Sequence, residues 1–108
     1  MHKVLVLLST YNGERFIKEQ LDSLLAQIGV DVTVMVRDDG SKDHTCAILK
    51  EYSAKHSNII VDFASNVGCA NSFGNLLLSA HDRINEFDYF AFSDQDDVWD
   101  NNKVKKTI

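Results

Sequence analysis

The sequence predicts a single α/β domain built on a mostly parallel β-sheet. Short apolar runs rich in Val, Leu and Ile alternate with longer segments in which apolar residues recur at helical spacing. This alternation is typical of βαβ units, whose helices cross over the sheet between parallel strands. The chain has 108 residues, of which 44% are hydrophobic and 25% are charged, as in an ordinary soluble globular domain. We therefore expect one domain spanning residues 1–108.

The first half of the chain contains two predicted strands and two predicted helices. The first strand runs from about Lys3 to Ser9. A helix from about Gly13 to Ile28 follows, because its apolar residues share one face. These residues are Ile17, Leu21, Leu24, Leu25 and Ile28. Gly29 is placed to end this helix, since glycine is favoured just beyond a helix C-terminus. The second strand covers Asp31 to Arg37.

The next predicted helix runs from about Asp43 to Ala54, with Ser41 or Asp43 as its cap. Its inner face should contain Ile48, Leu49 and Tyr52. The third strand is expected at Ile59 to Phe63, followed by a turn at Asn66–Gly68.

A third helix, from about Cys69 to Ala80, should complete the repeating pattern. Its expected buried residues are Phe73, Leu76, Leu77 and Ala80. The fourth strand covers Tyr89 to Ser93, and Asn101–Ile108 has the pattern of the first turns of a further helix. The predicted strand order is 3-2-1-4, with the first and fourth strands adjacent and helices on both faces of the sheet.

Polar side chains follow three of the predicted strands at the point where each strand ends. They lie in Ser9–Gly13, Arg37–Asp43 and Ser93–Trp99. Ligands of open α/β sheets bind in a crevice outside the carboxyl ends of the strands, at the point where the strand order reverses. The order 3-2-1-4 places such a point between the first and fourth strands. The three polar segments should therefore converge on one binding site.

Three carboxylates, those of Asp94, Asp96 and Asp97, lie within four residues after the fourth strand. Their mutual repulsion opposes folding, whereas a divalent cation would turn it into binding. Mg²⁺ and Mn²⁺ prefer carboxylate oxygens and leave positions open for phosphate. The net charge of −5 argues against nucleic-acid binding, which uses basic surfaces. The sequence therefore predicts a metal site for a phosphorylated ligand.

Other phosphate-handling α/β domains do not fit the order of these motifs. A phospho-acceptor receiver or a phosphatase with an aspartate nucleophile would carry acidic residues after the first strand, where this chain has Ser9–Asn12. Neither the phosphate-loop motif G-x-x-x-x-G-K-[ST] nor the glycine-rich turn G-x-G-x-x-G occurs in the chain.

Cys46 and Cys69 are expected to be reduced thiols, and no apolar run reaches the length of a membrane span. We therefore expect the protein to be cytoplasmic, and the alternative is a position at the inner face of the membrane.

The chain resembles family 2 glycosyltransferases, which have the Rossmann-like GT-A fold. The resemblance rests on four motifs in family order: Ser9-Thr-Tyr-Asn-Gly, Asp38-Asp-Gly-Ser-Lys-Asp-His-Thr, Asn66-Val-Gly and Ser93-Asp-Gln-Asp-Asp-Val-Trp. The last motif is similar to that of bacterial rhamnosyltransferase-like members, which build surface polysaccharide from dTDP-rhamnose. The resemblance implies inverting, metal-dependent sugar transfer, with residues 1–108 as the nucleotide-sugar-binding part.

The resemblance also implies roles for individual residues. Thr10 and Tyr11 would line the nucleotide pocket, and Asp39, with Asp38 beside it, would accept the N–H of uracil or thymine. Asn66 and Gly68 would allow the chain to approach the nucleotide closely. Asp94 would contact the ribose, and Asp96 would hold the Mg²⁺ or Mn²⁺ that bridges the diphosphate. Asp97 and Trp99 would border the sugar pocket.

Several of these side chains also have simpler structural interpretations. Asp43 is better explained as a helix cap than as a ligand. Asp97 could cap the terminal helix, and Trp99 could serve in packing. Tyr11 could be an ordinary aromatic residue at a strand end. The four histidines form no cluster along the sequence and receive no chemical role.

Members of the resembled family are usually much longer than this chain. The part that follows binds the saccharide acceptor and supplies the general base, which no residue here matches. Three hypotheses remain open: the donor-binding portion of a transferase, a stand-alone nucleotide-sugar-binding module that works with a partner, and an inactive truncated remnant. An unpaired sheet edge left by truncation would favour self-association.

Overall fold

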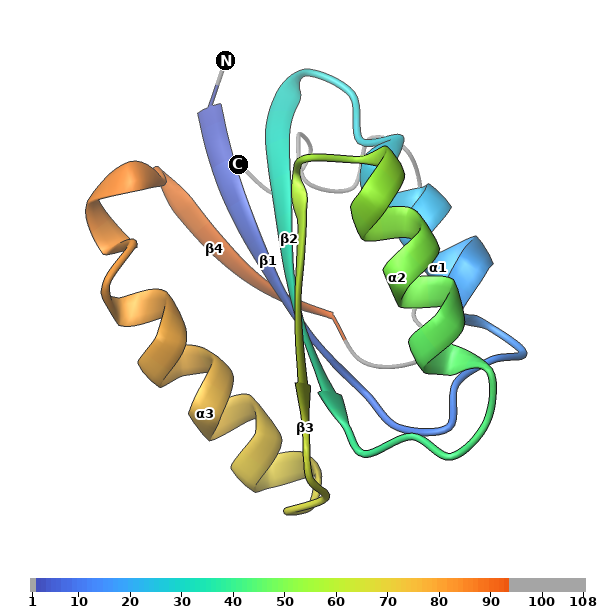
Figure 1. Ribbon diagram of the computed structural model, residues 1–108. Coiled ribbons are helices and arrows are strands. Elements are labelled where there is room, and N and C mark those ends of the chain that lie inside the picture. Colours follow the sequence, from blue (N-terminus) through green and yellow to red (C-terminus); the bar gives the residue numbers. More distant parts are fainter. Residues whose placement is uncertain (1, 94–108) are drawn as a thin grey trace.

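The computed structural model describes residues 2–93, which form a sheet between two layers of helices (Figure 1). The strands are β1 (His2–Thr10), β2 (Val30–Asp39), β3 (Ile59–Ala64) and β4 (Tyr89–Ser93). Their order is β3-β2-β1-β4, and the three pairings are parallel. The predicted order 3-2-1-4 is therefore confirmed.

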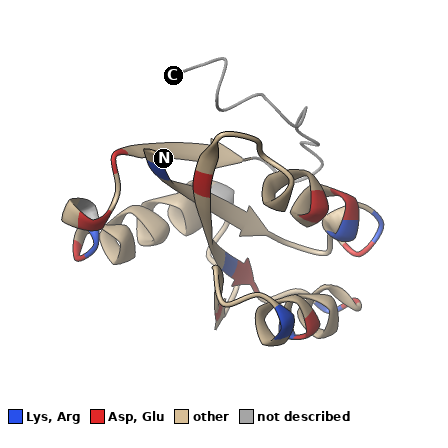
Figure 2. Ribbon diagram, turned by 90° about the horizontal axis from the view of Figure 1, so that it is seen from above, with Lys and Arg blue, Asp and Glu red and all other residues tan. Residues whose placement is uncertain are grey.

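The helices lie on both faces of this sheet, as expected. They are α1 (Ile17–Leu25), α2 (Thr45–Lys55), α3 (Cys69–His81) and a short 3-10 helix, η1 (Ile84–Glu86). Helices α1 and α2 cover one face, and α3 lies against the other (Figure 1). Seen from above, the charged residues gather mainly on the helices and loops, whereas the strands are mostly uncharged (Figure 2). None of the helices within residues 2–93 is long and apolar enough to cross a membrane.

Strand β1 is buried on both faces, which explains its nearly continuous apolar sequence. Because side chains alternate along a strand, Val4, Val6 and Leu8 join the core beneath α1 and α2. Leu5 and Leu7 join a smaller core beneath α3. The central strand thus carries two cores, and its carboxyl end is held from both sides.

Helix α1 is shorter at both ends than the predicted Gly13–Ile28. At its start, the amides of Phe16 and Ile17 both donate to the carbonyl of Gly13, which makes a turn before the helix. At its end, Gly29 adopts a φ of +77° but lies beyond the last helical residue, Leu25. Ile28 is 51% exposed, so its predicted place on the buried face is wrong.

Helix α3 buries only part of the predicted stripe, since Leu76 and Ala80 are buried and Phe73 is partly buried against the same core. Ser72, Leu76 and Ala80 are buried at successive spacings of four residues, whereas Leu77 is 50% exposed. The prediction for Leu77 is therefore wrong. Ser72 lies at the centre of the buried face because its hydroxyl has partners on β1 and β2, and this turns Leu77 toward the edge. The helix predicted at Asn101–Ile108 lies outside the described residues.

Candidate functional site

The carboxyl ends of β1 and β2 bring together the residues on which the binding prediction rests. Both strands extend farther than predicted, to Thr10 and Asp39, and Thr10 is paired in register with Asp38. The two aspartates are neighbours in the chain, so their side chains point to opposite faces of the sheet. Asp38 and Asp39 therefore organise two separate polar clusters, one on each side of the same strand end.

The Asp38 cluster shapes the turn between β2 and α2. The Thr10 hydroxyl donates to Asp38 Oδ1 over 2.8 Å, and the Ser41 hydroxyl donates to the same oxygen over 2.6 Å. Asp38 Oδ2 accepts from the Ser41 amide at 2.9 Å and from the Cys46 thiol at 3.2 Å. Asp38 and Thr10 are each 1% exposed. This carboxylate is thus surrounded by neutral donors from the end of β1, the loop after β2 and helix α2.

Cys46 is held as a thiol by this arrangement. Burial, together with the hydrogen bond to Asp38, raises the pKa of the Cys46 thiol to about 11. Because the thiolate is the reactive form of cysteine, Cys46 is a poor nucleophile at neutral pH. Its function here is to donate a hydrogen bond.

The Asp39 cluster connects β2 to the loop that follows β3. Arg37 Nη1 donates to Asp39 Oδ1 over 2.7 Å, and the Val67 amide donates to the same oxygen over 2.9 Å. The Gly68 amide donates to Oδ2 over 3.0 Å. Burial alone would raise the pKa of Asp39, but the hydrogen bonds from Arg37, Val67 and Gly68 outweigh it and lower this pKa. Asp39 is therefore ionised at neutral pH although it is 2% exposed.

A second set of hydrogen bonds joins the loops after β1 and β2. The Asn12 amide donates to Ser41 Oγ, and Asn12 Oδ1 accepts from the Lys42 amide, both over 2.8 Å. The Gly13 amide donates to Thr45 Oγ1 over 2.8 Å. These hydrogen bonds join the loop after β1 to the loop after β2. They also hold residues 13–16 as a turn, where the apolar periodicity predicts a helix.

Asp43 supports the loop before α2, but it is not the N-cap that the sequence predicts, because the N-cap residue is His44 and its side chain makes no capping hydrogen bond. Its Oδ1 accepts from the amide of Thr45 at 2.9 Å and from the Thr45 hydroxyl at 2.5 Å. Its Oδ2 accepts from the amide of Glu14 at 3.2 Å. Asp43 therefore links the start of α2 to the loop after β1.

Gly40 allows the loops after β2 and β3 to approach each other, and Gly68 allows an unusual backbone conformation within the second loop. Gly40 has a φ of +79°, and a Cβ there would come within 3.0 Å of the Asn66 amide nitrogen. Gly68 has a φ of +91°, which side chains rarely adopt, and the space around its missing Cβ is open. The structure thus places Asn66 and Gly68 beside the end of β2. Their contact with a nucleotide stays a prediction.

The structure brings together part of the predicted site. Thr10 lies with Asp38, whereas Asn66 and Gly68 lie with Gly40 and Asp39. Tyr11 follows directly after β1 and is 42% exposed. The remaining predicted residues, Asp94, Asp96, Asp97 and Trp99, lie outside the described residues. Among residues 2–93, no group of three or more His, Cys, Asp or Glu side chains could hold a metal ion. The metal prediction therefore depends on the carboxylates that follow β4.

Ser9 and Arg37 lie in the polar segments that the sequence predicts to converge on the site, but sequence reasoning assigned neither of them an individual role, and it assigned Ser72 no role at all. One signal was available, because a charged residue within an apolar strand needs a partner, and Asp39 lies two residues away on the same face. Nothing in the sequence indicated that Ser72 would meet them.

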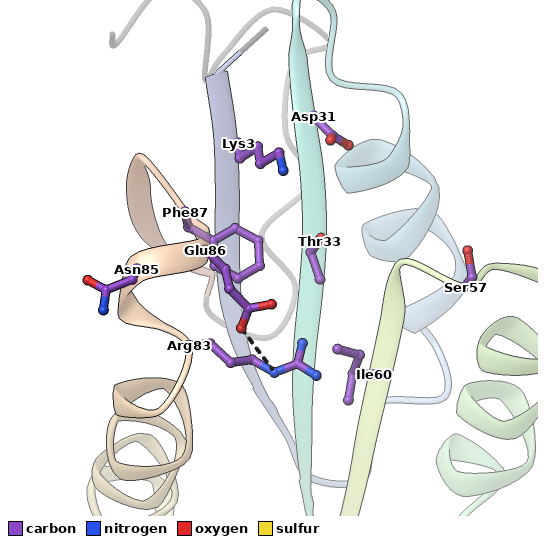
Figure 3. Close-up of a pocket in the computed structure, with 9 residues that line it drawn as sticks. All are labelled: Lys3, Asp31, Thr33, Ser57, Ile60, Arg83, Asn85, Glu86 and Phe87. Atoms are coloured by element: carbon purple, nitrogen blue, oxygen red, sulfur yellow. Dashed lines mark ion pairs between the residues drawn. The ribbon is translucent and has the colours of Figure 1, made fainter.

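A separate hollow lies at the opposite end of the strands, between the sheet and the segment after α3 (Figure 3). Lys3 and Asp31 line it from the amino-terminal parts of β1 and β2, and Arg83 and Glu86 line it from the other side. Arg83 Nε lies 4.0 Å from Glu86 Oε2. Because the two signs of charge alternate around this hollow, it offers no preferred place for a diphosphate.

Comparison with known proteins relates this geometry to a family. A family model described as Glycosyl transferase family 2 matches residues 5–108. The chain is 37% identical over 104 residues to the dTDP-rhamnosyl transferase RfbG of Shigella flexneri, covering 94% of this chain and 35% of that protein. An uncharacterized glycosyltransferase of Rickettsia prowazekii, RP339, is 31% identical over 105 residues, which cover 97% of this chain and 30% of RP339.

The fold of this chain is also similar to solved structures. Staphylococcus aureus TarS, residues 1–349 in complex with UDP, superposes with a TM-score of 0.81 at 31% identity, covering 97% of this chain and 30% of that 1–349 chain. The mannosyltransferase PcManGT of Pyrobaculum calidifontis, in complex with GDP-Man and Mn²⁺, superposes with a TM-score of 0.71 over 89% of this chain and 28% of PcManGT. At 24% identity, this second likeness shows the fold alone.

The predicted GT-A fold is thus confirmed, and so is the predicted family. The chain spans about a third of the length of the relatives that it matches. The family model covers nearly the whole chain, and its relatives above 30% identity cover almost all of it. This chain therefore belongs to glycosyl transferase family 2.

Proposed function

We propose that this chain is the nucleotide-sugar-binding part of an inverting, metal-dependent glycosyltransferase. One observation carries the proposal: Asp38, Asp39, Thr10 and the loop after β3 meet at the carboxyl edge of a parallel sheet. This edge is where open α/β sheets bind their ligands. The similarity to RfbG and the match to TarS in complex with UDP support a nucleotide ligand.

In the proposed complex, the nucleotide base lies against Thr10 and Tyr11, and Asp39 accepts its imide N–H. Asp39 suits this contact because it is ionised and therefore an acceptor only. Oδ1 already accepts two hydrogen bonds, whereas Oδ2 accepts one, from Gly68. Since Asp39 is 2% exposed, base binding includes a local shift of the Gly68 amide away from Oδ2.

The metal in this proposal is Mg²⁺ or Mn²⁺, with Asp96 as its ligand. Carboxylates are the donors that these hard cations prefer. The metal, when bound, would stabilise the charge that develops on the departing nucleoside diphosphate. Asp94 contacts the ribose, and Asp97 and Trp99 border the sugar. Mn²⁺ is bound in the structure of PcManGT, a protein that this chain resembles in fold alone.

The donor in this proposal is dTDP-rhamnose, and the acceptor is a cell-surface polysaccharide. The 37% identity to a dTDP-rhamnosyl transferase supports this donor. A UDP-sugar is the alternative, since TarS is seen with UDP and with UDP-GlcNAc. The acceptor and the general base belong to a part of the enzyme that this chain does not match. We place the reaction in the cytoplasm, at the inner face of the membrane.

The first test is a calorimetric titration of the 108-residue chain with dTDP and with UDP, in the presence and absence of Mn²⁺. We expect metal-dependent binding that disappears in Asp96→Ala. Asp31→Ala, which removes an exposed carboxylate at the other end of β2, should bind like the wild type. Absence of binding by either nucleotide would contradict the proposal and favour an inactive remnant. Binding without the remainder of the enzyme would also be consistent with a stand-alone module.

Self-association through β4 is part of the same proposal. Within residues 2–93, β4 pairs with β1 and lies at the edge of the sheet. Its Tyr89 and Phe92 are 41% and 53% exposed, and unpaired edges favour pairing between chains. Light scattering should show an oligomer that Tyr89→Lys disrupts. Phe63→Lys makes a matched change at the opposite edge, where Phe63 is 42% exposed, and should have less effect. A monodisperse wild-type monomer would contradict this part.

A further inference from the structure

Arg37 is a buried cation in a strand that is otherwise mostly apolar. Its side chain is 7% exposed, and it lies on the α3 face of β2, in register with Asp62 of β3. Removing a guanidinium from water is unfavourable unless its donors find partners. Arg37 finds three. Nη1 donates to Asp39 Oδ1 over 2.7 Å and to Ser72 Oγ over 3.0 Å, and Nη2 donates to the carbonyl of Ser65 over 3.3 Å.

Ser72 ties this cation to two further elements. Its Oγ accepts the hydroxyl hydrogen of Ser9 over 2.6 Å as well as the Arg37 hydrogen bond. Ser72 is 0% exposed and lies on α3, whereas Ser9 is on β1. The guanidinium is therefore fixed from β1, β2 and α3 together. Two of its three acceptors, Asp39 and Ser72, thus lie on the sheet and on α3, and the third is the Ser65 carbonyl of the loop after β3.

Arg37 and Asp39 together hold both ends of the loop after β3. Arg37 holds the loop at the Ser65 carbonyl, and Asp39 holds it at the amides of Val67 and Gly68. The loop between these points contains Asn66, which packs against Gly40. The position of this loop thus depends on the two charged side chains beneath it.

We propose that Arg37 is a positioning residue for nucleotide binding, which fixes Asp39 through Oδ1 and sets the loop of residues 65–68 beside the nucleotide. This inference rests on the proposed function. Because Arg37 occupies Oδ1, the second oxygen, Oδ2, is the one that can exchange the Gly68 amide for an N–H of the base. Arg37 itself touches no ligand in this arrangement.

The test uses Arg37→Gln in the full chain and begins without any nucleotide. NMR of the Asp39 carboxyl carbon should show that its pKa rises relative to the wild type, because the cation beside a buried carboxylate is gone. Hydrogen exchange at the Val67 and Gly68 amides should accelerate by about tenfold or more, because the loop loses its anchor at Ser65. Unchanged exchange and an unchanged Asp39 titration in the folded variant would overturn the proposal.

Nucleotide titration then connects the loop to binding. We expect Arg37→Gln to raise the Kd for dTDP or UDP by about tenfold, the effect of losing one charge-assisted interaction. Arg83→Gln makes the same substitution at the far end of the strands and should leave the Kd unchanged. Equal affinity of Arg37→Gln and the wild type would overturn the positioning role. If the wild type binds no nucleotide, the proposed function fails, and the ligand-free measurements still decide whether Arg37 orders the loop.

Arg37→Lys keeps the test decisive if Arg37→Gln does not fold. Lysine keeps the charge beside Asp39, so the variant should fold and leave the Asp39 carboxyl ionised. A single ammonium group cannot reproduce the fixed fork of a guanidinium, so the bond to the Ser65 carbonyl should be lost. The Val67 and Gly68 amides should then exchange faster than in the wild type. Protection equal to that of the wild type would show that the charge alone suffices, which would contradict the proposal.

Discussion

Asp38 and Asp39 are adjacent in the chain, yet they hold the molecule together in different ways. Asp38 faces α1 and α2 and accepts hydrogen bonds from neutral hydroxyl, thiol and amide groups near its own strand end. Asp39 faces α3 and pairs with the buried cation of Arg37 while it binds a loop from another part of the sheet. Asp38 joins the end of β1 to the turn before α2 through neutral donors, whereas Asp39 joins β2 to the loop after β3 with the help of a buried cation. The position of a carboxylate on one or the other face of a strand therefore decides its structural role.

The largest expected effect is that of Asp39→Asn on stability. The substitution keeps the shape of the side chain but leaves the Arg37 guanidinium buried without a counter-charge. Breaking a buried ion pair from one side typically costs about 3–5 kcal/mol. Urea denaturation should show a loss of this size. Asp62→Asn, at an exposed position in register with Arg37, is the control and should change the free energy of unfolding by less than about 0.5 kcal/mol.

Asp38→Asn should destabilise the chain less than Asp39→Asn. The donors around Asp38 are neutral, and the hydroxyls of Thr10 and Ser41 can rotate to accept a hydrogen bond from the new amide group. The expected loss is about 1–3 kcal/mol, as for one imperfectly satisfied buried polar group. Denaturation of both variants under the same conditions checks the order. A greater loss for Asp38→Asn would contradict the distinction drawn between the two carboxylates.

The pH dependence of stability should separate the two aspartates further. The folded-state pKa of Asp39 is lowered, so this carboxylate stabilises the fold above its unfolded pKa, and the contribution is lost as the pH falls through the folded pKa. The stability difference between the wild type and Asp39→Asn should therefore shrink below about pH 4. The pKa of Asp43 is also lowered, but Asp43 is present in both proteins. A constant difference from neutral to acidic pH would contradict this expectation.

The reactivity of Cys46 should report on the Asp38 cluster without any change in stability at Cys46 itself. With a thiol pKa of about 11, Cys46 should react with iodoacetamide at pH 8 about a hundredfold more slowly than an ordinary thiol of pKa about 8.5. Asp38→Asn should accelerate the reaction, whereas Asp39→Asn should not. Mass spectrometry in a Cys69→Ser background follows Cys46 alone. An unaltered rate in folded Asp38→Asn would show that Asp38 does not control this thiol.

The sequence predicted the strand order, and it predicted that the polar residues after β1 and β2 meet at one edge of the sheet, because both follow from local patterns. Alternating apolar runs and helical segments are sufficient to indicate a parallel sheet, and parallel strands bring their carboxyl ends to one edge. The sequence predicted only part of the buried stripe of α3, because it placed Leu77 there and left Ser72 out. Leu77 is apolar but half exposed, and Ser72 is polar but fully buried. Ser72 is buried because its hydrogen-bond partners, Ser9 and Arg37, lie 63 and 35 residues away in the chain. The ends of α1 were missed for a similar reason, because the Gly13 amide is bound to Thr45.

The sequence by itself determined the fold class, the order of the strands and the identity of the two aspartates at the end of β2. These follow from the periodicity of apolar residues and from polar groups placed directly after strands, both of which are properties of short segments. Only the tertiary structure decided that Arg37 would lie beneath the loop of residues 65–68, with Ser72 and Ser9 supporting it. The physical reason is that a buried charge must satisfy all its donors at once, and in this protein the acceptors come from β2, α3 and the loop after β3, which meet only when the sheet and α3 are assembled.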